Sequence, residues 1–78
     1  MLKEFLVEIR VKDWIHVPKS ISRTVTYVEV LAVDEVYARS VGFDEFAKRS
    51  KYEPITRRLM ETRGLQLEDC CAPDSVEI

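Results

Sequence analysis

Residues 24–41, TVTYVEVLAVDEVYARSV, decide the fold of this chain. Their first ten positions are dominated by β-branched and aromatic side chains, which is the composition of a strand. Asp34 then offers a helix N-cap, and the acid at Glu35 suits the positive end of a helix dipole. The stretch therefore predicts a strand over residues 23–33 that runs with almost no loop into a helix.

This strand carries apolar residues on both of its faces. Glu29 is expected to face solvent, and the alternation of a strand places four apolar side chains with it: Val25, Tyr27, Leu31 and Val33. The opposite face, which we expect to contact the core, carries Thr24, Thr26, Val28, Val30 and Ala32. A sheet face that meets only water should be more polar than the Glu29 face. A second layer is therefore expected on that side, from this chain or from another subunit.

A first strand is expected over residues 3–17. Apolar side chains alternate there with charged ones at Phe5, Val7, Ile9 and Val11, with Leu6 as the exception. Pro18 removes a ladder donor, so the end of this strand must lie at an edge or a bulge. The short connection over residues 19–22 suits an antiparallel return and hence a β-hairpin.

The helical region allows two interpretations. A straight helix from residue 34 to residue 51 would be apolar on two nearly opposite sides: Tyr37, Ala38 and Val41 against Phe43, Phe46 and Ala47. Either the helix breaks at Gly42 and restarts near Asp44, or it continues and packs on something at its far side. We favour a break or kink at Gly42.

Pro54 ends this segment and suits the first turn of a second helix over residues 54–63, with Gly64 as its C′ residue. Residues 66–78 form an acidic tail in which the alternation Val76-Glu77-Ile78 suggests a short last strand over residues 75–78. The predicted fold is a single α+β domain over residues 1–78. A small antiparallel hairpin sheet is covered by one kinked or two successive helices.

The composition narrows the classes of function. The 78 residues carry a net charge of −2, which gives no general attraction to nucleic acid or to an acidic membrane. The charged N-terminal segment has neither the pattern of a signal peptide nor that of an anchor. The two cysteines, Cys70 and Cys71, are adjacent and therefore strained as a pair, so a reducing, cytoplasmic setting is expected.

A basic segment is the most visible candidate for binding an acidic partner. Residues 48–63 have a net charge of +4 and residues 65–78 a net charge of −4. Read as a site, the basic segment would direct four side chains to phosphates or to an acidic surface: Lys48, Lys51, Arg57 and Arg58. A solvated helix face, neutralised by the acidic tail, is the favoured interpretation.

Nothing in the spacing of residues indicates an enzyme. His16 could be combined with Asp13 and the two cysteines into a metal or nucleophile site, but the chain has no second histidine and no C-x-x-C. Acids at Glu68, Asp69 and Asp74 would raise a neighbouring thiol pKa. We therefore expect no catalytic site, no metal and no cofactor, and inert, half-buried thiols.

Large apolar side chains near the sheet are the candidates for binding protein: Trp14, Ile15, Tyr27 and Leu31. A short chain with surplus apolar surface favours self-association. We expect a small accessory protein that forms a homodimer through the outer sheet face, with nucleic-acid binding by residues 48–63 as the alternative. Small accessory proteins with this strand-to-helix junction are common, including in phages, but that analogy is architectural only.

Overall fold

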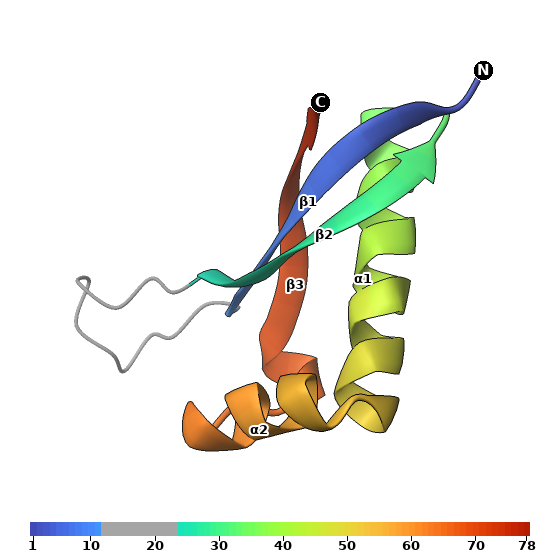
Figure 1. Cartoon of the computed structure of the whole chain (residues 1–78). Helices are drawn as coiled ribbons and strands as arrows, with labels where there is room; N and C mark the ends of the chain where they lie inside the picture. The colour runs from blue at the N-terminus through green and yellow to red at the C-terminus, as the bar shows by residue number, and fades with distance from the viewer. Residues whose placement is uncertain (12–23) are drawn as a thin grey trace.

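The computed structural model describes residues 1–11 and 24–78 of the chain. The elements follow in the order β1 (Lys3–Val11), β2 (Thr24–Ala32), α1 (Glu35–Tyr52), α2 (Pro54–Thr62), a short 3₁₀ turn (Leu67–Asp69) and β3 (Cys70–Glu77). The strands form one antiparallel sheet in the order β2-β1-β3; α1 packs across one face of this sheet, and α2 packs against α1 (Figure 1). The predicted α+β fold with two successive helices and a C-terminal strand is confirmed.

The central strand β1 supplies the middle of the core. Its inward side chains at Phe5, Val7 and Ile9 are at most 2% exposed. Val7 lies opposite Val28 of β2, and the predicted core face of β2 is confirmed, since Val28, Val30 and Ala32 are all buried. Positions 12–17 of the first predicted strand, and position 23 of the second, lie outside the described residues.

A bulge in β2 overturns one prediction about its faces. Ile9 lies opposite Thr26 while the next residue, Arg10, lies opposite Thr24, so Val25 is an extra residue in the ladder. An extra residue reverses the alternation beyond it. Val25 is accordingly only 5% exposed and belongs to the core. Its predicted place on the outer face, with Tyr27 and Leu31, is wrong. The predicted place of Thr24 on the core face is wrong for the same reason, since its Oγ1 atom reaches Glu8 on the outer face.

Helix α1 begins where the sequence predicts, because the Asp34 carboxylate accepts a hydrogen bond of 2.8 Å from the Tyr37 amide. The favoured break at Gly42 is wrong, since α1 is continuous from Glu35 to Tyr52. Three residues spaced four apart, Ala38, Gly42 and Phe46, are buried along one line of the helix. A Cβ atom at Gly42 would lie 2.7 Å from the Val7 Cβ atom. Gly42 therefore permits close packing of helix on sheet.

The predicted second helix is confirmed as α2. The chain turns at Glu53, Pro54 occupies the first turn of α2, and Gly64 follows the C-cap with a φ of 64°. Met60 is the residue of α2 that is buried. Arg57 of α2 donates a hydrogen bond from its Nη2 atom to the Lys51 carbonyl at the end of α1, which ties the two helices together.

The last strand is longer than predicted and begins at Cys70. Glu8 lies opposite Asp74 and Arg10 opposite Cys71, so β3 also carries an irregularity, at the point where Pro73 stands. A proline is tolerated at such a bulge in an edge strand. Ser75 is 4% exposed, and its Oγ atom donates a 3.0 Å hydrogen bond to the Glu35 carbonyl. The strand is thereby fastened to the start of α1.

Candidate interaction surface

The sheet face opposite the helices, here called the outer face, carries a row of apolar side chains. The ladder places Leu6 between Glu29 of β2 and Val76 of β3. Ile78 joins the same face, because its amide donates a 2.9 Å hydrogen bond to the Glu4 carbonyl. Leu6 is half-buried, whereas four side chains are more than half exposed: Tyr27 (52%), Leu31 (57%), Val76 (60%) and Ile78 (67%). Several large apolar side chains exposed side by side on one face are typical of a contact surface.

Carboxylates are interspersed among these apolar side chains. The registers place four acids on the outer face: Glu4, Glu8, Glu29 and Asp74. Arg10 supplies positive charge at one end, close to Glu8. A shallow hollow of about 220 Å³ lies between Leu31 and Ile78 and is bordered by Glu4 and Glu29. The outer face is therefore both apolar and acidic.

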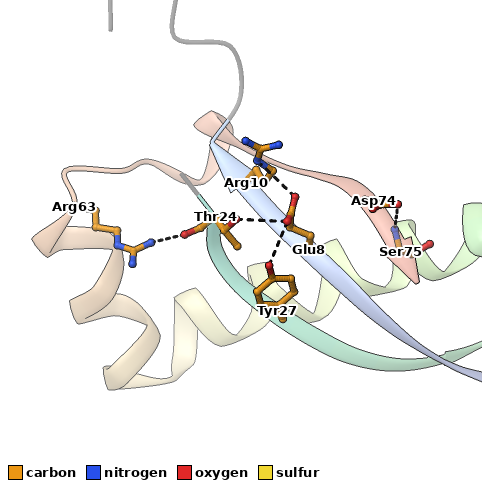
Figure 2. A network of polar contacts seen from close by, with 7 residues as sticks. All are labelled: Glu8, Arg10, Thr24, Tyr27, Arg63, Asp74 and Ser75. Atoms are coloured by element: carbon orange, nitrogen blue, oxygen red, sulfur yellow. Dashed lines mark hydrogen bonds and ion pairs between the residues drawn. The ribbon is translucent and has the colours of Figure 1, made fainter. Parts of the chain in front are cut away.

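Glu8 holds one end of the outer face in place (Figure 2). Its Oε2 atom accepts hydrogen bonds from Tyr27 Oη at 3.4 Å and from Thr24 Oγ1 at 3.5 Å. Its Oε1 atom lies 3.5 Å from Arg10 Nε. Each contact is long and partly exposed, so each contributes little by itself. Glu8 of β1 thereby links Thr24 and Tyr27 of β2 across the outer face.

Two of the four predicted protein-binding residues lie on this surface. Tyr27 and Leu31 project from the same face of β2. Trp14 and Ile15 lie outside the described residues. Val76 and Ile78 were missed as candidates, although their alternation with Glu77 suggested a strand. Without the register of β3 against β1, the sequence could not show which face they share.

The four predicted phosphate- or acid-binding residues lie on α1 and α2. Lys48, Lys51, Arg57 and Arg58 are all exposed. Lys51 Nζ lies 5.4 Å from the centre of the Tyr52 ring, and Arg57 is engaged with the Lys51 carbonyl. Arg58 belongs to the surface of α2 beside Ile55. These positive charges are thus distributed over the junction of the helices.

The expected neutralisation of the basic segment by the acidic tail is not seen as direct ion pairing. The ion pairs among residues 1–11 and 24–78 are Lys3–Glu77, Arg10–Glu8 and Arg49–Glu45. Arg63 instead donates from Nη1 to the Thr24 carbonyl at 2.8 Å (Figure 2). The same Nη1 atom donates to the Val25 carbonyl at 3.3 Å. This contact stabilises the β2 bulge, because it gives both carbonyls a charged donor.

The cysteines are both free, as expected from their adjacency. Cys70 is buried and Cys71 half-buried, and the Cys70 Sγ atom lies 3.6 Å from the Gln66 carbonyl. Burial raises the pKa of the Cys70 thiol, and the charges of Asp69 and Cys71 raise it further. The neutral thiol is therefore favoured, which makes Cys70 a poor nucleophile. His16 and Asp13 lie outside the described residues.

Comparisons with protein-family models, with curated proteins and with solved structures find no match to this chain. Within residues 1–11 and 24–78, no group of three or more histidine, cysteine or acidic side chains is arranged to hold a metal ion. In the same part of the chain, no helix is long and apolar enough to cross a bilayer. The physical character of the surfaces is therefore the basis for a functional proposal.

Proposed function

We propose that this protein is a small, non-catalytic interaction module that associates with a second copy through the outer face and the adjoining edge of its sheet. The observation that carries the proposal is the position of Tyr27 and Leu31, which are 52% and 57% exposed on edge strand β2. Val76 and Ile78 extend the apolar surface across the sheet. A homodimer is the smallest assembly of this kind.

The energetic scale favours a weak to moderate association. Complete burial of a large apolar side chain contributes about 1.5–3 kcal/mol, and a side chain already half covered contributes less. Each copy contributes four such side chains, and the eight together roughly offset the about 4–15 kcal/mol lost when two molecules lose their independent motion. A stable dimer therefore requires further contacts, such as hydrogen bonds between the subunits.

Nucleic-acid binding by the basic segment is the alternative, and the exposure of Lys48, Lys51 and Arg58 favours it. Arg57 and Arg63 already donate to backbone carbonyls within the chain. A phosphate would have to compete with those contacts. Binding of DNA with a steep salt dependence, lost in a Lys48→Ala/Arg58→Ala variant, would identify this second function.

The test of self-association is the molecular mass in solution over a range of concentrations, measured by light scattering. We expect the mass to rise to that of a dimer. Leu31→Lys should weaken association at least tenfold, because it removes a large apolar side chain from the contact and introduces a charge there. The matched control is Ile55→Lys, since Ile55 is 84% exposed on α2 and should tolerate the change. A wild-type protein that stays monomeric at every concentration would refute the proposal.

A further inference from the structure

The edge of β2 that faces away from β1 has a defined set of outward backbone groups. The Ile78 amide donates to the Glu4 carbonyl, so the backbone polar groups of Glu4 point toward β3. Leu31 lies opposite Glu4, and in an antiparallel ladder such a residue directs its N–H and C=O away from β1. The register is regular from there to Thr26. Tyr27, Glu29 and Leu31 therefore present their backbone donors and acceptors at the edge.

These outward groups have few partners within the described part of the chain. One outward carbonyl, that of Tyr27, accepts a long hydrogen bond of 3.4 Å from Thr26 Oγ1. No hydrogen bond among residues 1–11 and 24–78 engages the outward amides of Tyr27, Glu29 and Leu31. An unpaired edge of this kind is a template for another strand.

The other edge of the sheet, on β3, is better protected against pairing with another strand. On β3, Pro73 has no amide donor, and the Ser75 amide already donates to Asp74 Oδ1 at 2.9 Å (Figure 2). On β2, Arg63 covers the carbonyls of Thr24 and Val25. The remainder of β2, TYVEVLA, contains no proline, lysine or bulge. Of the usual devices that discourage edge pairing, it has a single charge, Glu29.

Two copies could join by stacking their outer faces or by pairing along the edge of β2, and the distribution of charge favours the second. Stacking the outer faces would oppose the four carboxylates of one copy, at Glu4, Glu8, Glu29 and Asp74, to the same four of the other. Pairing along β2 brings Glu29 alone next to its counterpart, because the other acids lie on β1 and β3. Like charges directly opposite each other are unfavourable, so edge pairing carries the smaller penalty.

We propose that two copies pair antiparallel along β2, about a two-fold axis at Glu29, to form one continuous six-stranded sheet. This inference rests on the self-association proposed above and specifies its geometry. With Glu29 at the axis, Tyr27 lies opposite the partner's Leu31, and all outward groups of residues 27–31 find partners in about six hydrogen bonds. Moving the axis to position 28 or 30 would lose pairs to the bulge at Val25 or to the end of the strand.

Two cross-strand pairs of Tyr27 with the partner's Leu31 would then lie on the outer face. An aromatic and an aliphatic side chain directly opposite each other stabilise a strand pair. Val76 lies two strands away from the axis and stays outside the contact. The hydrogen bonds supply the contribution that apolar burial alone does not.

Substitution of Glu29 provides the test, with dissociation constants measured by light scattering or analytical ultracentrifugation. Glu29→Pro removes an edge donor that does not take part in the β1–β2 ladder, so the fold should tolerate it. We expect it to weaken association at least tenfold. Glu29→Gln keeps the donor and removes the repulsion, so we expect about two- to fivefold tighter association. Stacked outer faces would instead be tightened by both substitutions, since each removes a carboxylate.

Two controls complete the experiment. Glu77→Pro places a proline at an outward position of β3 and should leave the dissociation constant unchanged. Val76→Lys should also leave it unchanged, whereas stacking of the outer faces would be weakened. A dimer that resists Glu29→Pro, or that is lost in Val76→Lys, overturns edge pairing but leaves self-association standing. A monomeric wild-type protein overturns both.

If Glu29→Pro does not fold, amide hydrogen exchange on the wild-type protein decides the question. We expect the Tyr27, Glu29 and Leu31 amides to exchange more slowly as the protein concentration rises, with the Glu77 amide unaffected. Exchange at these three amides that does not change between monomer and dimer would refute edge pairing.

Discussion

Replacement of Gly42 by alanine tests how closely α1 packs on the sheet. The added Cβ atom would lie 2.7 Å from the Cβ and Cγ1 atoms of Val7 and 2.8 Å from its Cγ2 atom. Carbon atoms pack at about 3.5–4.0 Å, so helix and strand would have to separate by roughly 1 Å. Val7 is fully buried at the centre of the sheet and cannot rotate into free space.

The expected size of the effect follows from two opposing contributions. Alanine is favoured over glycine inside a helix by about 0.8–1.0 kcal/mol. Overpacking of a well-filled core costs about 1–3 kcal/mol. Because the clash is with a β-branched side chain in the central strand, the second contribution should be the larger. We expect Gly42→Ala to lower the free energy of unfolding by about 1–2 kcal/mol, since separation would also loosen Ala38 and Phe46.

The free energy of unfolding is measured by urea titration followed by circular dichroism. In a thermal scan, the melting temperature should fall by about 4–8 °C for each kcal/mol lost. Position 40 supplies the matched control, because Ser40 is exposed on the same helix. There, Ser40→Ala should be more stable than Ser40→Gly by about the propensity difference. If alanine at position 42 stabilises the protein as it does at position 40, the close approach of Gly42 to Val7 is refuted.

Two further predictions concern Arg63 and Cys70. Arg63→Met should lower the free energy of unfolding by about 1–3 kcal/mol, because the Thr24 and Val25 carbonyls lose a charged donor; the exposed Arg58→Met should change it by less than about 0.5 kcal/mol in the same urea titration, and equal effects would contradict the role of Arg63. Because burial raises the pKa of the Cys70 thiol above its ordinary value, its alkylation in the folded protein should reach half-maximal rate at a higher pH than in urea, as measured by mass spectrometry. The neutral buried thiol also stabilises the fold fully below the unfolded-state pKa, and this contribution declines as the pH rises toward the folded-state pKa. A half-maximal pH for Cys70 alkylation that is no higher in the folded protein than in urea would contradict both statements.

Local signals were sufficient for most of the element boundaries. The N-cap at Asp34, the proline at Pro54 and the glycine at Gly64 each act within one turn of the chain, and each marks a boundary in the structure. The alternation of Phe5, Val7 and Ile9 likewise identifies the core face of β1. These features depend on the nearest neighbours in sequence, which a single sequence displays directly.

The errors arose where the outcome depended on a distant partner. Val25 changes face because of a bulge that is visible only in the register of β2 against β1. Gly42 was interpreted as a helix breaker, but its lack of a side chain serves contact with Val7, thirty-five positions earlier in the sequence. The helical line of Ala38, Gly42 and Phe46 could have suggested this, since small residues permit close approach. The length of β3 was underestimated for the same reason, since its pairing with β1 is not visible in the sequence.

The candidate surface was only half predictable. Tyr27 and Leu31 follow from the alternation of β2 around Glu29, which is a local pattern. Val76 and Ile78 join them only because β3 adds to the other side of β1. The sequence could not show which edge of the sheet is open to pairing and which is covered, because this depends on contacts such as that of the Ser75 amide with Asp74.

The order β2-β1-β3 has a consequence for synthesis on the ribosome. The middle strand, β1, is made first, and its neighbour β3 is made last of all the elements. Until residues 70–77 emerge, a nascent chain that has already formed the hairpin and helices presents β1 as an open edge, with Phe5, Val7 and Ile9 beside it. Unpaired edges and exposed apolar surface make such intermediates prone to aggregation. Completion of the domain should therefore coincide with emergence of β3, and protection of β1 before that moment would fall to chaperones.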